Sequence, residues 1–203
     1  MRCPGFLLLL AAALTLSGCA GGNSRPEAGR YDFGSPADSR QAPAVGIGSV
    51  EVQARSWLAS ADMQYRLAYA DTGRRYSYVD SRWAAPPAEL LERFLTRRIV
   101  FGQRPDAAGA GCRLRLVLDD LIQDFADARS SQVSLEASAV LLPARGGEPL
   151  ARRALQVRAP APTADAAGGV QATRAAAQTL ADDIDAWLAA VAKNPGTASS
   201  RCQ

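Results

Sequence analysis

The chain has 203 residues, a formal net charge of +3 and no histidine. Without histidine, catalytic triads and dyads that use an imidazole base are excluded, as are most zinc sites. Arginines are spread along the chain rather than gathered into a basic stripe, so nucleic acid is not an expected partner.

An apolar run, Phe6 to Leu16, follows Arg2 near the N-terminus. This is the pattern of a secretory signal peptide, and the run is too short to span a bilayer. It ends in Leu16-Ser17-Gly18-Cys19, which resembles the lipobox of bacterial lipoproteins. We therefore predict a signal peptide over residues 1–18 and a covalent lipid on Cys19, with no other cofactor. The alternative is an ordinary signal peptide that contains a cysteine. Ala20, where aspartate would favour inner-membrane retention, favours an outer-membrane lipoprotein that faces the periplasm.

Residues 19–43 are mostly Gly, Ser, Pro, Ala and charged residues. Such a composition buries too little apolar surface to offset the entropy of ordering. We predict a lipidated flexible tether here and a single folded domain over residues 44–203. The piece Tyr31-Asp32-Phe33 interrupts the tether and is a candidate start of the ordered body.

The first half of the domain is predicted as three strands and a helix. A strand over residues 45–52 carries a bulge at Gly48–Ser49, where the alternation slips. Residues 63–69 form the second strand, and residues 75–79 pair back on it as a hairpin. A helix then begins at Pro86–Pro87. Its apolar face consists of Leu90, Leu91, Phe94, Leu95 and Ile99.

The second half repeats this order without a residue-level repeat. Strands are predicted over residues 112–125, with a phase break at Asp119–Asp120, over 133–141 and over 155–159, and a helix over Val170–Val191. The order βββα-βββα indicates an α+β fold, with an antiparallel or mixed sheet and two main helices packed on one face.

Two cysteines remain in the mature domain, Cys112 and Cys202. In an oxidising compartment an even pair favours a disulfide, and two free thiols are the alternative. The aspartates at 119, 120, 124 and 127 lack the spacing of a calcium-binding loop. We interpret them as polar strand and turn positions, and we predict no metal site.

Several short motifs together carry a family signal. The chain reads Val50-Glu51-Val52, then Met63-Gln64-Tyr65-Arg66, then Ser81-Arg82-Trp83 before the helix at Pro86–Pro87. With the lipobox and Tyr31-Asp32-Phe33, this resembles the ABC-type transport auxiliary lipoproteins, the family of PqiC-like lipoproteins.

The resemblance implies a non-enzymatic component of an envelope transport system for lipids or other hydrophobic compounds, docking at the outer membrane. Its implied partners are an MCE-domain protein and ABC or related inner-membrane transporter components, and a homo-oligomer is a further expectation. The other candidate is a structural or assembly lipoprotein that binds peptidoglycan or an outer-membrane barrel. Arg66, Tyr76, Tyr78 and Trp83 are the candidate partner surface. The structural roles weighed against it are a core anchor that seals the hairpin against the first helix, which is favoured for Trp83, sheet-face packing for the two tyrosines, and a solvated or paired Arg66.

The lipobox generates the first testable prediction. Replacing the thiol in Cys19→Ser should block acylation, so that uncleaved or mislocalised precursor accumulates. Labelling cells with a fatty-acid probe and fractionating the envelope would measure both effects. Labelling of the variant, together with outer-membrane fractionation, would contradict the lipobox.

Overall fold

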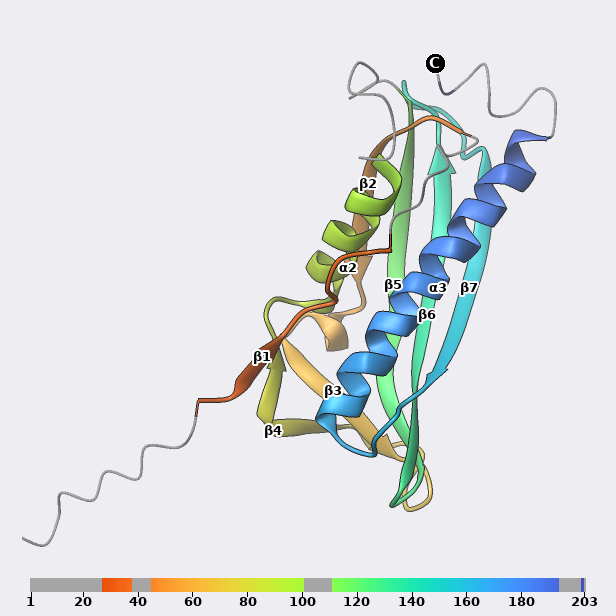
Figure 1. Cartoon of the computed structure of the whole chain (residues 1–203). Coiled ribbons are helices and arrows are strands. Elements are labelled where there is room, and N and C mark those ends of the chain that lie inside the picture. The colour runs from red at the N-terminus through yellow and green to blue at the C-terminus, as the bar shows by residue number, and fades with distance from the viewer. Residues whose placement is uncertain (1–26, 38–44, 101–110, 194–201, 203) are drawn as a thin grey trace, which may run out of the picture.

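The computed structural model describes residues 27–37, 45–100, 111–193 and 202 (Figure 1). The predicted signal peptide and Cys19 lie outside the described residues. Seven strands form one mixed sheet, and both long helices lie on the same face of it (Figure 1). This confirms the predicted α+β class. Within the described residues, no helix has the length and apolar character needed to cross a membrane.

The elements follow the predicted order, with one additional strand at the start. The strands are β1 (Gly29–Tyr31), β2 (Ile47–Ala54), β3 (Asp62–Leu67), β4 (Tyr76–Trp83), β5 (Cys112–Asp127), β6 (Ser130–Leu142) and β7 (Ala151–Pro160). The helical elements are the short 3-10 turn η1 (Ser56–Leu58), α2 (Pro87–Leu95), its π-helical extension η2 (Thr96–Val100), and α3 (Ala166–Ala192).

Strand β5 is the centre of the sheet. It pairs in parallel with β2 from Cys112 to Leu118 and in parallel with β3 from Gln123 to Phe125. On its other side it pairs with β6 in antiparallel fashion, and β7 follows β6 as an edge strand. Strand β4 pairs with β3 antiparallel and with β1 in parallel. Two different strands therefore share one side of β5, one along each half of its length.

Both predicted irregularities are present. The register of β2 against β5 shifts between Ile47 and Ser49, and the register of β5 against β6 shifts between Leu118 and Asp120. A bulge leaves an extra residue on one strand and restores the alternation beyond it. The second bulge allows Leu118 and Leu121 both to face the helices, where each is buried.

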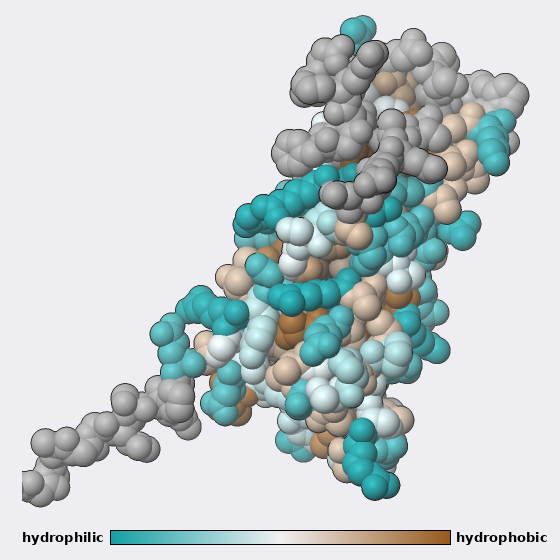
Figure 2. All heavy atoms as spheres, in the orientation of Figure 1, coloured by the Kyte–Doolittle hydropathy of each residue, from teal (hydrophilic) through white to brown (hydrophobic). Residues whose placement is uncertain are grey.

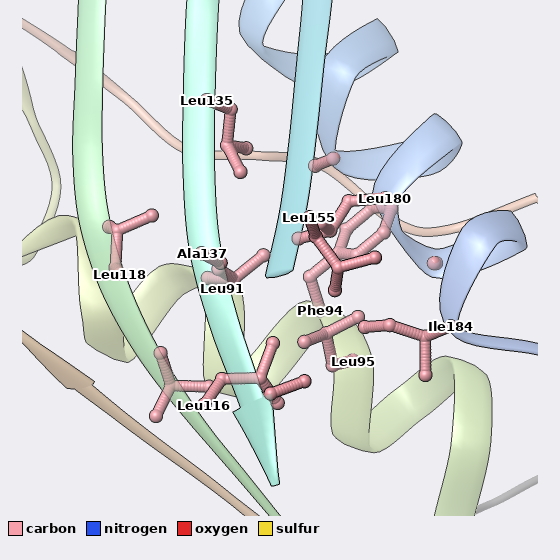
Figure 3. Close-up of a cluster of buried hydrophobic side chains, with 14 of the residues drawn as sticks. Leu91, Phe94, Leu95, Leu116, Leu118, Leu135, Ala137, Leu155, Leu180 and Ile184 are labelled. Atoms are coloured by element: carbon pink, nitrogen blue, oxygen red, sulfur yellow. The ribbon is translucent and has the colours of Figure 1, made fainter. Parts of the chain in front are cut away.

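The core lies between the sheet and the two helices (Figure 3). Leu91 and Leu95 of α2 and Leu180 and Ile184 of α3 are fully buried against the leucines of β5 and β6. Small residues on the buried face of α3 let its backbone approach the sheet; they are Ala172, Ala176, Ala177 and Ala181. Fully burying a side chain of this kind contributes roughly 1.5–3 kcal/mol.

Strand β1 lies within the range predicted as a tether. It pairs with β4 at Gly29–Ser81, Arg30–Arg82 and Tyr31–Trp83. Two residues later Phe33 is 2% exposed, and its ring meets Trp83 edge to face with 5.2 Å between centroids. The ordered body therefore includes residues 29–33, as the aromatic piece Tyr31-Asp32-Phe33 indicated and the tether range 19–43 did not. The reason is the contact of Phe33 with Trp83, fifty residues away in the sequence.

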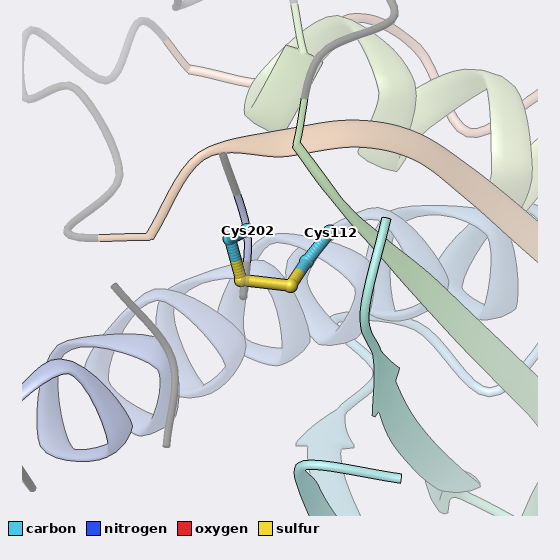
Figure 4. The surroundings of a disulfide bond; sticks show 2 residues. All are labelled: Cys112 and Cys202. Atoms are coloured by element: carbon cyan, nitrogen blue, oxygen red, sulfur yellow. A yellow bond between two sulfur atoms is a disulfide. The ribbon is translucent and has the colours of Figure 1, made fainter. Parts of the chain in front are cut away.

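The structure joins Cys112 to Cys202 by a disulfide, as predicted (Figure 4). Cys112 is the first residue of β5, and both cysteines are buried. The bond closes a loop with a sequence separation of 90 residues and ties the C-terminus to the central strand.

Removing this bond should destabilise the domain. The chain-entropy model gives about 4–5 kcal/mol for a loop of this length, as an upper limit. We expect Cys202→Ser to lower the urea midpoint, and reductant to lower it for the wild type. Reductant should leave the variant unchanged, which makes the variant its own control. An identical midpoint for oxidised wild type and variant would contradict a stabilising bond.

Candidate functional site

The open face of the sheet, which the helices leave uncovered, carries a dense cluster of charges. Arg75 Nη2 lies 2.7 Å from both carboxylate oxygens of Asp120. Arg66 Nη1 lies 3.2 Å from Asp124 Oδ1, and its Nη2 lies 3.9 Å from Asp120 Oδ2. We call these four residues the arginine–aspartate cluster. Their charges balance, so the cluster neutralises itself.

The bulge in β5 explains why acidic residues gather here. Because it adds a residue at Asp119–Asp120, both carboxylates reach the open face. Asp119 accepts hydrogen bonds from Arg55 Nε at 2.9 Å and from Ser138 Oγ at 2.6 Å. Arg55 directly follows β2, so this contact fixes the end of that strand beside β5.

Burial governs the electrostatics of the cluster. It raises the pKa of Asp124, against the opposing effect of the Arg66 charge. Arg66 Nε and Asp124 Oδ1 are both buried without a hydrogen-bond partner, although the 3.2 Å ion pair brings their charges together. Within the described ranges no group of three or more potential ligands could hold a metal ion. The cluster therefore fastens β3 and the start of β4 to β5.

The predicted partner surface is divided between the two faces of the sheet. Arg66 lies on the open face, whereas Tyr76 stacks on Tyr65 on the opposite side, with 5.3 Å between ring centroids. Tyr78 donates a hydrogen bond to Gln123 Oε1 at 3.0 Å, and burial raises the pKa of its hydroxyl.

Trp83 is 4% exposed and belongs to the core, which is the role of a core anchor and removes it from the candidate partner surface. Arg66, Tyr76, Tyr78 and Trp83 therefore do not form one exposed surface. Alternation in β3 and β4 separates Arg66 from the two tyrosines, because successive side chains point to opposite faces. The register shift between β3 and β4 then brings Trp83 to the same side as Tyr78, where both line one small cavity.

A buried polar contact that the sequence did not predict joins the sheet to α3. Gln123 is 4% exposed, and its Nε2 donates to Ser131 Oγ at 2.8 Å and to the carbonyl of Asp165 at 3.1 Å. Asp165 caps α3 by accepting from the Gly168 amide at 2.7 Å, and that bond lowers the pKa of Asp165. Gly169 lies directly against the Gln123 amide. A cavity of about 20 Å³ beside this contact has room for one water.

This contact generates a stability prediction. A Cβ at position 169 would overlap Gln123 Oε1, so Gly169→Ala should disturb the hydrogen bonds at the start of α3. We expect a loss of about 1–3 kcal/mol in the free energy of unfolding, measured by urea denaturation. Gly73→Ala is the matched control, because its added Cβ would meet only Asp71 Oδ1 at 3.5 Å. Equal stability of the two variants would show that the Gln123 side chain moves aside without loss of stability.

Comparison with known proteins identifies the family. A profile described as ABC-type transport auxiliary lipoprotein component matches residues 33–185, most of the chain. This chain belongs to that family. The match places it among lipoproteins of the cell envelope that accompany transport systems and are described as auxiliary components. No curated protein sequence matches the chain.

Solved structures show the same fold. Protein XCC0632 from Xanthomonas campestris, assigned to the DUF330 family, is 20% identical, with a TM-score of 0.67. The similarity covers 80% of this chain and 96% of that one. A second crystal structure, of an uncharacterized protein, is 11% identical with a TM-score of 0.61 and covers 80% of this chain and 99% of that one. At these identities the likeness concerns the fold alone.

Proposed function

We propose that this protein is a non-enzymatic auxiliary lipoprotein of an ABC/MCE-type transport system for lipids or other hydrophobic compounds. In this proposal Cys19 carries the outer-membrane anchor. The folded domain docks with an MCE-domain protein, which connects it to the inner-membrane transporter components. The family match over residues 33–185 is the observation that carries the proposal.

The distribution of charge suggests where docking occurs. Arg113 of β5 and Arg152 and Arg158 of β7 are exposed on the open face. We call these three residues the basic strip. None of them forms an ion pair within the described part of the chain. Leu142 lies opposite Arg113 and Val140 opposite Arg152, so half-buried apolar side chains lie between these two arginines.

This pattern fits an acidic partner surface. Unpaired charges around apolar contacts favour a partner of opposite charge and disfavour a partner of like charge. The arginine–aspartate cluster offers no such preference, because its charges are already paired. We therefore place docking on the basic strip rather than on the β3–β4 hairpin predicted from the sequence.

Charge reversal in the basic strip should weaken capture of the partner. For the double variant Arg113→Glu with Arg152→Glu, we expect roughly tenfold weaker binding to the MCE-domain protein. Co-purification from detergent-solubilised envelope, quantified by mass spectrometry, is the measurement. The melting temperature should change little, because both side chains are exposed.

The matched control reverses two arginines away from the open face. Arg93 lies on α2 and Arg129 in the turn between β5 and β6, and both are exposed. Arg93→Glu with Arg129→Glu should retain the partner. Equal losses in both double variants would reject the basic strip as the docking surface. Capture of only peptidoglycan or an outer-membrane barrel by the wild type would reject the transport role in favour of an assembly role.

A further inference from the structure

We propose that the open side of one lobe of the domain rests on the lipid bilayer that carries the Cys19 anchor. The lobe consists of β1, η1, β3 and β4, and we call it the anchor lobe. Trp57 and Val79 are its lipid contacts. This inference rests on the proposed lipidation of Cys19, and its test measures lipidation separately.

Chain length places the anchor lobe near the membrane. Gly29, the first residue of β1, follows Cys19 by ten residues. Ten residues span at most about 36 Å, whatever conformation they adopt. Strand β5 alone is 16 residues long, about 53 Å. The segment from Cys19 to Gly29 is therefore shorter than the domain, and it joins the domain at the anchor lobe (Figure 1).

Exposed apolar side chains gather in the same region. Among the described residues the exposed large hydrophobic side chains are Trp57 at 50%, Tyr69 at 54% and Val79 at 70%. All three lie between η1 and β4, although the core draws on every element of the domain. A single exposed apolar residue needs no explanation, but every large one that the described residues expose belongs to this lobe or to the turn between its two strands. Tryptophan in particular favours the membrane–water interface.

Val79 lies on the side that the helices leave open, and the backbone of Trp57 is hydrogen-bonded to a side chain of that side. Tyr78 points toward the helices, so its neighbour Val79 points away from them. The carbonyl of Trp57 accepts a hydrogen bond from Gln64 Nε2 at 2.7 Å. Gln64 Oε1 in turn accepts from Arg75, a member of the open-face cluster, at 2.9 Å.

The charge on β1 of the same lobe suits a lipid surface. Arg30 lies opposite Arg82 in the pairing of β1 with β4. Arg82 pairs with Asp62 at 3.1 Å, whereas Arg30 has no acidic partner within the described residues. A basic residue near an anionic membrane surface favours binding. Asp80, exposed on β4, limits the net positive charge of this region, so we expect apolar contact to contribute more to membrane binding than charge does.

The anchor lobe and the basic strip serve different contacts. Strands β3 and β4 run obliquely to β5, β6 and β7 (Figure 1). Because the sheet twists, its open side at the anchor lobe points in a different direction from its open side at β7. A domain that rests on lipid through Trp57 therefore leaves Arg152 and Arg158 available to a protein partner.

The positions of the three tryptophans permit a direct test. Trp83 and Trp187 are 4% and 8% exposed, so only Trp57 is open to contact quenching. The full-length lipidated protein is reconstituted in vesicles of phosphatidylethanolamine and phosphatidylglycerol with brominated acyl chains. Intact mass confirms the lipid on Cys19. We expect the protein to fluoresce less in these vesicles than in unbrominated ones. The loss should be no larger than the share of emission that Trp57 contributes, which the Trp57→Phe variant measures.

Two variants and the soluble quencher acrylamide separate the possible outcomes. Trp57→Phe should show no loss beyond that of buried tryptophan, and Arg30→Glu should reduce the loss in phosphatidylglycerol vesicles but not in phosphatidylcholine vesicles. Absence of quenching in the lipidated wild type would overturn the proposal. Protection of Trp57 from acrylamide only after the MCE-domain protein is added would also overturn it, and would assign this side to a protein. Partner capture and intact mass report the proposed function independently.

Discussion

The fold depends on one strand that holds two neighbours along the same edge. Strand β5 pairs with β2 through its first half and with β3 through its second, and its bulge at Asp119–Asp120 lies between the two. Backbone pairing alone would leave each short neighbour easy to displace. The carboxylates on the open face of β5 add side-chain contacts, since Asp119 binds Arg55 after β2 and Asp124 binds Arg66 of β3.

These ion pairs matter chiefly for position. Each pair is partly exposed, and such pairs contribute little to stability because water and salt screen them. Arg75, however, lies 2.7 Å from both carboxylate oxygens of Asp120 and also donates a hydrogen bond to Gln64. Such geometry selects one register of β3 and β4 against β5. The charged residues of the β3–β4 hairpin therefore have a structural role, which is to hold β3 and β4 in register with β5. Charges that remain unpaired are better candidates for partner binding.

The sequence predicted the local features of the fold more fully than the contacts between distant segments. Alternation and glycine placement were enough for β2, β5, β6 and both bulges, and the apolar spacing was enough for α2 and α3. For β1 the sequence offers only the aromatic piece Tyr31-Asp32-Phe33 within a range whose composition predicts a tether, because this strand is held by β4 and by the contact of Phe33 with Trp83. Gln123 gave no signal either, because a buried amide is recognised only when its partners on α3 are known.

The segment after β1 shows how a short strand at the start of the domain is held in place. A three-residue strand is weak by itself, but the chain continues across the helices (Figure 2 shows the mixed polar and apolar surface on this side). Arg174 donates to the carbonyl of Asp32 at 3.1 Å, and Gln178 accepts from the amide of Ala37 at 2.9 Å. Arg98 of η2 donates to the carbonyl of Ala37 at 2.9 Å.

Arg98 also connects this N-terminal segment to α3. It also pairs with Asp182 and Asp185 of α3 at 2.7 and 3.1 Å, and burial raises the pKa of Asp185 despite that pairing. A pull on the N-terminal segment is thus resisted by β4, by α3 and by η2 together. Because Phe33 also lies in the aromatic core, detaching the segment would expose Trp83 and disturb the anchor lobe. The point where the chain enters the domain is therefore fixed at Gly29. In the proposed arrangement, this fixed point restricts the side of the domain that can meet the membrane.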